Sequence, residues 1–331
     1  MIDRVYQELV AHRTDLVGRL NIFQDDLDKK FQAIVKNNWK EITPSSTTKK
    51  KMVAVDGGEF VKEMRTGALF ILNGEALIIE GVNVLDTDQE VKTGVFRPGN
   101  KAKDRAGELM AVMELKLALA NGAKGDWILV DGSLKKKLGE VKPLETNFEF
   151  VEGEIKGLEQ EDEDIMLSHL IFEKQVYLTE LIKRYGSKVV WISKVSRSRD
   201  LFHHDLSDVT LLETFTSSPG FSTTKCRPIV RGEIEGGDPR KDLEKVEVCS
   251  FYARLDKDEN VLRFDIIGRS DEQFIQQLLS DLQSVSVKGY PYPLVRVHYD
   301  VKVSSRDRKR IIEILNLKRK RSVDWWPGQF Y

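Results

Sequence analysis

The chain has 331 residues, of which 40% are hydrophobic and 32% are charged, and 52 Lys and Arg against 53 Asp and Glu leave a net charge of −1. This length suits one large or two modest domains, and the balanced charge excludes a uniformly basic nucleic-acid-binding protein. The sequence contains no run of 18 apolar residues and no signal-peptide pattern at its N-terminus. Its two cysteines, Cys226 and Cys249, lack paired metal-ligand spacing and indicate a reducing compartment. We therefore predict a cytoplasmic protein without a membrane segment.

The predicted elements begin with helices. Residues 2–39 carry apolar side chains at three-, four- and seven-residue spacings, which predicts an amphipathic helix or helical pair. Such a segment either packs on its own domain or forms an arm that binds a second subunit. Residues 43–48 are rich in Thr, Ser and Pro and are typical of a linker. We expect a helical arm over residues 1–45 and a larger domain over residues 46–331.

Strands are predicted from Lys51 onwards. Three antiparallel strands are expected at Met52–Asp56, Gly67–Leu72 and Ala76–Val84, with a tight hairpin turn at Asn73-Gly74. A loop at residues 94–99 leads to a helix from about Asp104 to Asn121 and then to the strand Trp127–Asp131. A strand, a helix and a strand in succession predict a right-handed parallel crossover.

The second half of the chain is less regular. A helix over about Asp164–Arg184 and a buried strand at Lys188–Ser193 are followed by residues 196–245, for which no assignment is made. Residues 151–164 are acidic and are expected to be exposed. The remaining expected features are a hairpin of residues 246–255 and 260–268, a helix over 271–282, a late helical stretch, a basic run at 318–321 and an aromatic tail at 325–327.

Two similar segments carry the first candidate site residues. Met52–Gly58 and Trp127–Ser133 are each a short apolar run that ends in Asp-Gly and a small residue. An ionised Asp at the end of a buried strand is costly unless a cation or strong donors meet it. If the two strands are neighbours, Asp56 and Asp131 converge on one point, and paired carboxylates favour Mg²⁺ or Mn²⁺.

A third acid lies between them in the sequence. Glu114 has apolar neighbours on its own helical face, at the positions three and four residues away. It is either paired with a buried cation or is a metal or catalytic carboxylate. The order of elements predicts an α/β, ribonuclease H-like fold with a mixed five-stranded sheet flanked by helices, an N-terminal helical arm and C-terminal helical additions. Three such acids can hold two divalent cations about 4 Å apart for phosphodiester hydrolysis.

Basic residues follow the same strand ends. The run Lys135–Lys137 comes just after Asp131, and Lys194, Arg197 and Arg199 come just after the next strand. If the strands are parallel, all of these cations lie at one edge of the sheet, where α/β sites usually occur. Cations around metal-binding acids suit a polyphosphate substrate. We therefore expect DNA contacts from Lys135, Lys136, Lys194, Arg197 and Arg199.

A late histidine is the last candidate. His298 follows Tyr290-Pro291-Tyr292-Pro293, whose prolines fix the entry into a helix. It either makes a local hydrogen bond or completes the metal site. His169, His203 and His204 lack such a setting and are interpreted as structural.

Taken together, these motifs resemble those of the NurA nucleases. The shared features are Val-Asp-Gly-Gly at 55–58, the apolar helix with Glu114, Val-Asp-Gly-Ser at 130–133, the Lys194 segment and Gly-Tyr-Pro-Tyr-Pro-Leu with His298 at 289–298. The resemblance covers nearly the whole chain and is weakest over residues 196–245. Gly58 departs from the family pattern, in which Ser is common at that position.

The resemblance implies both a site and an activity. Asp56, Glu114, Asp131 and His298 would bind metal, and Tyr290, or less favourably Tyr292, would complete the catalytic set. The implied activity is a Mn²⁺-dependent DNase, with two ions and Mg²⁺ as an alternative, that degrades DNA from 5′ to 3′ and also cuts single strands. The implied assembly is a homodimer bound to a hexameric HerA-type DNA translocase in end resection.

Two other functions compete with this prediction. An actin-like or sugar-kinase-type ATPase would use two Asp-Gly turns as phosphate loops, but its duplicated second meander is missing after Asp131. A non-catalytic DNA-binding subunit would have no reason to keep three acids that are costly to bury. Cleavage of end-labelled DNA and hydrolysis of ATP distinguish the three.

Overall fold

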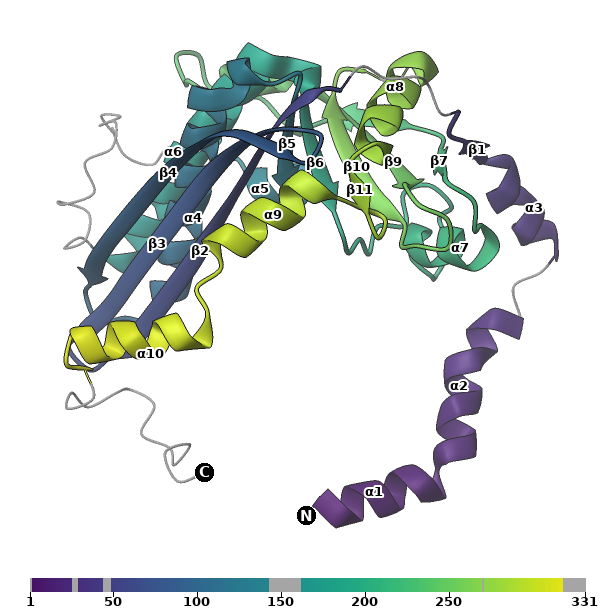
Figure 1. The fold of residues 1–331 in the computed structure, drawn as a ribbon, viewed down its shortest axis with the longest axis horizontal. Coiled ribbons are helices and arrows are strands. Elements are labelled where there is room, and N and C mark those ends of the chain that lie inside the picture. The colour runs from purple at the N-terminus through teal and green to yellow at the C-terminus, as the bar shows by residue number, and fades with distance from the viewer. Residues whose placement is uncertain (1, 26–28, 44–48, 143–161, 270, 318–331) are drawn as a thin grey trace.

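The computed structural model describes residues 2–25, 29–43, 49–142, 162–269 and 271–317. Its centre is a mixed sheet of ten strands within these ranges, in the order β1-β7-β9-β10-β6-β5-β2-β3-β4, with β8 paired to β9 (Figure 1). The strands are β1 (Trp39–Glu41), β2 (Lys51–Met64), β3 (Gly67–Glu80), β4 (Asn83–Phe96), β5 (Trp127–Asp131), β6 (Val189–Ser193), β7 (Gly220–Ser222), β8 (Lys225–Pro228), β9 (Glu247–Arg254) and β10 (Leu262–Ile267). A separate pair is formed by β11 (Ser286–Val287) and β12 (Tyr290–Pro291).

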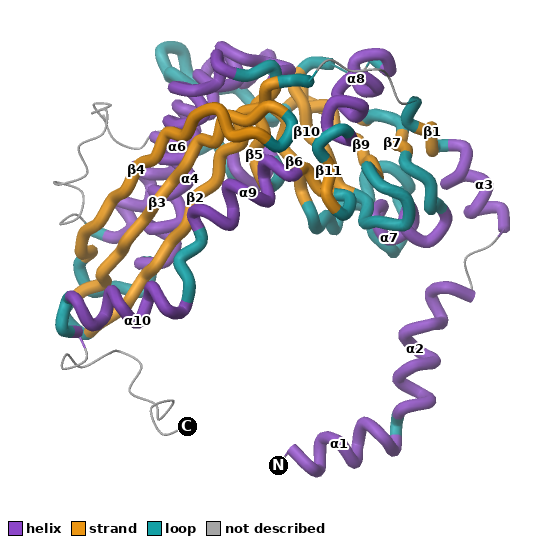
Figure 2. The backbone as a smooth tube through the Cα atoms, viewed as in Figure 1, coloured by secondary structure: helices purple, strands orange, loops and turns teal. Residues whose placement is uncertain are grey.

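Helices cover both faces of this sheet (Figure 2). The α-helices are α1 (Ile2–Ala11), α2 (Arg13–Asp25), α3 (Lys29–Asn37), α4 (Ala102–Asn121), α5 (Leu134–Leu138), α6 (Glu163–Tyr185), α7 (Asp208–Phe215), α8 (Glu272–Gln283), α9 (Tyr292–Val301) and α10 (Ser305–Ile314). The described residues also contain the short 3₁₀ helices η1 (Gly122–Lys124), η3 (Gly186–Lys188) and η4 (Lys241–Lys245).

Alternation along β2 shows how the two hydrophobic layers form. Met52 and Ala54 pack with the side chains of α8 and α9, whereas Val53 and Val55 pack with those of α4 and α6. Successive side chains of a strand point to opposite faces, so an uninterrupted apolar run is buried only when both faces are covered. All four residues are at most 1% exposed. By this alternation, Asp56 lies on the α9 face of the sheet.

The predicted antiparallel meander is confirmed, but its predicted turn is wrong. β2, β3 and β4 are antiparallel neighbours of 14 residues each, and Asn73 and Gly74 lie inside β3, opposite Gly58 and Gly57 of β2. The strand continues through Asn73-Gly74 because β2 and β4 pair with it on both sides there. Asp56 therefore lies within β2 and does not end it, although the parallel pairing with β5 stops one residue earlier, at Val55.

The parallel part of the sheet is also as predicted. β5 pairs in parallel with β2 and with β6, which places the ends of β5 and β6 beside Asp56. The predicted count of five strands is wrong, because the antiparallel strands β10, β9 and β7, with β1 and β8, extend the sheet beyond β6. Two of them, β7 and β8, come from residues 196–245, where composition gave no strand signal.

The first two helices, α1 and α2, lie away from the sheet (Figure 1). α1 has no buried residue, and its apolar side chains Ile2, Val5, Leu9 and Val10 are at least 45% exposed. α3 differs, because its Val35 is fully buried against α7 and β9. No helix among the described residues has both the length and the apolar composition needed to cross a membrane.

Cys226 and Cys249 form a disulfide. They are directly opposite each other in the antiparallel pairing of β8 with β9. The prediction of a reducing compartment rested on two cysteines without paired spacing in the sequence. It loses this support because strand register, which the sequence spacing does not reveal, brings the two thiols together. Several predicted segments lie outside the described residues. They are residues 44–48 of the expected linker, residues 151–161 of the acidic segment 151–164, the basic run at 318–321 and the aromatic tail at 325–327.

Candidate active site

Asp56 of β2 is held by contacts within its own strand and with α9. Its Oδ1 accepts a hydrogen bond from the backbone N–H of Gly57 at 2.9 Å, and its Oδ2 lies 2.7 Å from Nδ1 of His298. Pro291 and Pro293 fix the backbone at the start of α9, which places the histidine about two turns into the helix. Of the two alternatives for His298, the local hydrogen bond is wrong, because its Nδ1 contacts an acid 242 residues away.

Glycine at position 57 allows α4 to approach this strand. A Cβ at Gly57 would lie 2.6 Å from Cγ of Met110 and 3.0 Å from Oε1 of Glu114. Real Cβ atoms essentially never show the first of these distances, so a side chain at position 57 would force the Met110 side chain or α4 to shift. Gly57 thus brings Glu114, from the opposite face of the sheet, to the residue that follows Asp56.

Glu114 is 5% exposed and forms an ion pair with Lys137 of α5. Of the two alternatives for Glu114, the structure shows the buried ion pair, and the role of this acid as a metal or catalytic carboxylate stays a prediction. Lys137 is a residue that the sequence prediction of DNA contacts did not include. The sequence did not distinguish it within its run, because only the placement of α5 half-buries Lys137 and leaves Lys135 and Lys136 exposed.

Asp131, the last residue of β5, has two partners from distant segments. Its Oδ1 accepts a hydrogen bond from the Tyr290 hydroxyl at 3.2 Å, and its Oδ2 lies 3.2 Å from Nζ of Lys194. The same ammonium group lies 4.5 Å from the centre of the Tyr290 ring, within the range of a cation–π contact. Tyr292 instead occupies the first position of α9 and packs against the hydrophobic layer of α8 and α9.

Burial and like charges define the electrostatics of the site. Burial, and after it the charge of Glu114, raises the pKa of Asp56 above its ordinary value, and the hydrogen bond with His298 opposes this shift. Burial and the adjacent Asp131 carboxylate raise the pKa of Tyr290 as well, so its phenol stays protonated and donates to that carboxylate. The charged form of Asp56, which burial disfavours, is stabilised by any cation brought to it.

The donor set fits a divalent metal ion. Asp56, Glu114 and Asp131 supply carboxylate oxygens and His298 supplies an imidazole, which are ligands that Mn²⁺ accepts and of which Mg²⁺ prefers the oxygens. In the described chain, the His, Cys, Asp and Glu side chains form no group of three that could hold an ion as they stand. Each acid is turned to a cationic or ionisable partner instead, as described above: His298, Lys137 or Lys194. These partners compensate the negative charge of the three acids, which a bound metal ion would otherwise neutralise.

The other predicted DNA contacts lie at the same edge of the sheet. Lys135 and Lys136 on α5, and Arg197 and Arg199 on the segment after β6, are all exposed. None of the four has an ion-pair partner within the described part of the chain. His203 and His204 lie further along that segment, where Nδ1 of His204 accepts the N–H of Leu206, and His169 lies on α6.

One acid near the site had no clear signal in the sequence. Glu75 of β3 is directly opposite Asp56 in the antiparallel pairing, and it is only 3% exposed. Burial, with the nearby charge of Asp300 on α9, raises its pKa, and a hydrogen bond from Gln89 opposes the shift. Its position inside a strand that the sequence split at Asn73-Gly74 explains why it was overlooked.

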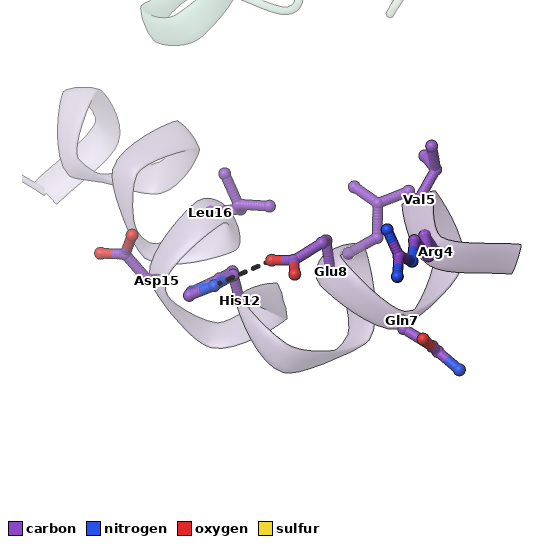
Figure 3. A pocket seen from close by; sticks show the side chains of 8 residues that line it. Arg4, Val5, Gln7, Glu8, His12, Asp15 and Leu16 are labelled. Carbon is purple, nitrogen blue, oxygen red and sulfur yellow. Dashed lines mark ion pairs between the residues drawn. The ribbon is translucent and has the colours of Figure 1, made fainter. Parts of the chain in front are cut away.

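A larger hollow lies along α1 and α2 and does not form a comparable site (Figure 3). Its volume is about 650 Å³, and its lining comes from positions 4–16 of the two helices. All of its lining residues are exposed, and the ion pair of Glu8 with His12, at 3.3 Å, is a local contact between residues one turn apart. Such pairs contribute little to stability and select no ligand.

Comparison with known proteins gives one consistent family. The NurA domain model matches residues 50–303 of the chain. The DNA double-strand break repair nuclease NurA of Sulfurisphaera tokodaii is 37% identical over 336 residues, which cover 100% of both chains. The crystal structure of the NurA nuclease from Sulfolobus solfataricus superposes with a TM-score of 0.82 at 37% identity, covering 99% of this chain and 100% of that one. A NurA structure with dAMP and manganese bound has a TM-score of 0.64 at 13% identity, with 93% and 97% coverage, and shares the fold.

Proposed function

Because the chain belongs to the NurA family, we propose that it is a metal-dependent DNA nuclease that hydrolyses phosphodiester bonds in the repair of double-strand breaks. The observation that carries this proposal is that Asp56, Glu114 and Asp131, on β2, α4 and β5, are each paired with a cationic or ionisable side chain from another element. A site built from buried acids and exchangeable cations can take up both a metal ion and a phosphate. The relatives named above are DNA repair nucleases, which supports the same assignment.

We assign the roles of the site residues as follows. Asp56, Glu114, Asp131 and His298 hold manganese, with two ions as the proposed number and Mg²⁺ as an alternative. When bound, the metal activates water and neutralises charge on the phosphate. Tyr290 keeps Asp131 oriented through its hydrogen bond, and Lys194, already beside that carboxylate, is placed to contact a phosphate oxygen.

In this proposal, His298 also transfers a proton. Its Nδ1 is held by Asp56, while 54% of its side chain is exposed. An imidazole oriented by a carboxylate and open to solvent can exchange a proton with a phosphodiester oxygen. This arrangement is compatible with a ring that turns to a metal ion once Asp56 binds that ion.

The finer features of the activity are proposals as well. We propose 5′ to 3′ exonuclease activity on single- and double-stranded DNA, with endonuclease activity on single strands. The neighbouring strands β4, β3 and β2 are antiparallel, and β5 and β6 run parallel to β2. A ribonuclease H-like core has this arrangement, which supports our proposal of a ribonuclease H-like fold. DNA contacts are assigned to the exposed Lys135, Lys136, Arg197 and Arg199, together with Lys194, at the edge that carries the acids.

We further propose that the chain works as a homodimer with a hexameric HerA-type DNA translocase, in the cytoplasm where its substrate lies. The support is the exposed apolar face of α1, which has no partner within the described chain, and the separate position of α1 and α2 in Figure 1. We keep the division into an arm over residues 1–45 and a nuclease domain over residues 46–331. Replacing Val5 and Leu9 by Asp and measuring molar mass by light scattering tests the role of the arm.

The nuclease proposal is tested by cleavage of end-labelled single- and double-stranded DNA in Mn²⁺, Mg²⁺ or EDTA. The variants are Asp56→Ala and Asp131→Ala, and the matched control is Asp86→Ala, which removes the same charge from an exposed position paired with Lys124. We expect metal-dependent cleavage by the wild type and the control, and a loss of at least about a hundredfold in the two site variants.

Different outcomes point to different errors. Cleavage retained by Asp131→Ala would contradict the metal site. ATP hydrolysis without DNA cleavage would favour the ATPase alternative. The label position after brief digestion decides the polarity, because shortening from the 5′ end releases a 5′ label first.

A further inference from the structure

A second cavity lies beside α5 and the segment that follows β6. Its volume is about 330 Å³, close to the lower bound of about 300 Å³ that small-molecule pockets usually have. Fourteen residues line it, and they come from α5, the segment after β6, β8 and its flanks, β9 and β10. Phe264 of β10 points to one face of the sheet, and the cavity lies on the other face. The neighbours of Phe264 in the strand, Arg263 and Asp265, point to that other face and line the cavity.

The charge of this cavity is predominantly positive. Its lining contains five cationic residues, Lys135, Lys225, Arg227, Arg231 and Arg263, against the two acids Asp200 and Asp265. Arg227 pairs with Asp200 at 2.9 Å and Arg263 with Asp265 at 2.9 Å, so both acids are neutralised within the cavity. Lys135, Lys225 and Arg231 have no ion-pair partner in the ranges that the structure describes.

Asp265 is fully engaged and contributes no free negative charge. It is 1% exposed and accepts hydrogen bonds from the Ser250 hydroxyl at 2.7 Å, from Arg263 and from the backbone N–H of Leu134 at 3.2 Å. A saturated carboxylate of this kind positions Arg263 and does not repel an anion. The three unpaired cations therefore set the character of the open part of the cavity.

The remaining lining is apolar and aromatic. Leu201, Pro228, Ile229 and Val248 form an apolar wall, and the buried Tyr252 contributes a ring whose hydroxyl is already bonded to Asp208. Flat heterocycles bind to apolar and aromatic side chains by stacking and burial, whereas cations bind phosphate. Both halves of a nucleotide find suitable partners in one cavity of adequate size.

The cavity is joined to the active site by short covalent and hydrogen-bonded links. Asp131 is followed within three residues by Leu134, whose N–H is bound by Asp265 of the cavity. Arg263 is directly opposite Ser193 in the pairing of β10 with β6, one residue before Lys194. A ligand in the cavity therefore borders the two segments that supply Asp131 and Lys194.

We propose that this cavity is a nucleotide-binding subsite, which holds a nucleoside monophosphate unit with its phosphate on Lys225, Arg231 and Lys135 and its base on the apolar wall. It rests on the proposed nuclease function for its physiological source, which is either the 5′-phosphorylated terminal nucleotide of a strand or a released mononucleotide. The phosphate chemistry is common to both sources. The site is separate from the metal-binding acids, since none of Asp56, Glu114 and Asp131 lines it.

The test is binding of dAMP and of deoxyadenosine in EDTA, measured by calorimetry, so that binding through a metal ion does not contribute. The double variant Lys225→Ala/Arg231→Ala removes two exposed cations from the cavity. Arg65→Ala is the control for loss of a surface cation outside the cavity, because Arg65 is exposed in the turn between β2 and β3. We expect the wild type and Asp56→Ala to bind dAMP equally, and the double variant to bind it at least about tenfold more weakly.

A second arm identifies the source of the nucleotide. Short single strands with a 5′-phosphate or a 5′-hydroxyl are compared under the same conditions. A preference for the phosphorylated strand that the double variant loses assigns the cavity to a strand end, and binding confined to dAMP assigns it to released product. Either result supports the subsite.

Three results would overturn the subsite: equal affinity of the wild type and the double variant, equal affinity for dAMP and deoxyadenosine, or an equal loss in Arg65→Ala. A wild type that binds neither dAMP nor the phosphorylated strand overturns it as well. DNA cleavage is measured in parallel with Mn²⁺. Cleavage without the binding difference rejects the subsite alone, whereas the binding difference without cleavage rejects the nuclease proposal alone.

Discussion

Replacing Gly58 by alanine places a side chain in the contact between β2 and the end of α9. A Cβ at Gly58 would lie 2.0 Å from the carbonyl oxygen of Val301 and 2.6 Å from Oδ1 of Asn73. The same carbonyl accepts a hydrogen bond from Nδ2 of Asn73 at 2.9 Å. Because the clash is with backbone, α9 must move away from the sheet, and rotation of a side chain is not sufficient.

The magnitude follows from these two effects. Forcing extra volume into a packed contact costs about 1–3 kcal/mol. Loss of the Asn73 hydrogen bond adds about 1 kcal/mol. We therefore expect Gly58→Ala to lower the free energy of unfolding by about 2–4 kcal/mol. His298 is one turn before Val301, so the same displacement draws it away from Asp56, and cleavage should fall as well.

The assay is urea denaturation followed by circular dichroism, with Gly107→Ala as the control. Gly107 lies inside α4, and a Cβ there has no heavy atom within 4 Å. Alanine is preferred over glycine in a helix by about 1 kcal/mol, so the control should be more stable than the wild type. If Gly58→Ala lowers the free energy of unfolding and Gly107→Ala raises it, a general effect of replacing glycine by alanine is excluded. A Gly58→Ala variant that unfolds at the wild-type urea concentration would refute the packing argument.

Three further predictions concern charges. Burial raises the pKa of Asp238, but hydrogen bonds from Arg240 outweigh this effect and hold the pKa below its usual range. The ionised carboxylate therefore stabilises the fold at a pH above its unfolded pKa. This stabilisation is lost as the pH falls through the lower pKa of the folded state. Asp238→Asn should thus cost about 3 kcal/mol at pH 7, and denaturation at decreasing pH should show the difference closing only in strong acid. Lys137→Met leaves the charge of Glu114 uncompensated, so the melting temperature of this variant in EDTA should be lower than that of the wild type. Addition of Mn²⁺ should make this difference in melting temperature smaller, because the ion replaces the lost positive charge. A difference that Mn²⁺ leaves unchanged would contradict the exchange of Lys137 for a metal ion. Arg105 is fully buried and its guanidinium lies 4.6 Å from a phenylalanine ring centre, so Arg105→Lys should cost about 2 kcal/mol in urea denaturation, whereas equal stability would show that charge alone suffices.

The sequence was sufficient for the features that depend on local pattern. Apolar runs with Asp-Gly ends located β5 and the first part of β2, and the long apolar helix located α4 with Glu114 on it. The succession of a strand, a helix and a strand was sufficient to predict the parallel pairing of β2 with β5, because crossovers of this kind have one common arrangement. The convergence of Asp56 and Asp131 follows from that pairing.

Only the tertiary structure decided the contacts between distant segments. Strand length was misjudged at Asn73-Gly74, because pairing with neighbours on both sides outweighs the turn preference of that dipeptide. Cys226 and Cys249 meet through strand register, and Glu75 comes to lie opposite Asp56 for the same reason. The cations beside the acids illustrate the general limit: a run of lysines shows no face until α5 is placed, and the placement depends on burial and charge summed over the whole molecule.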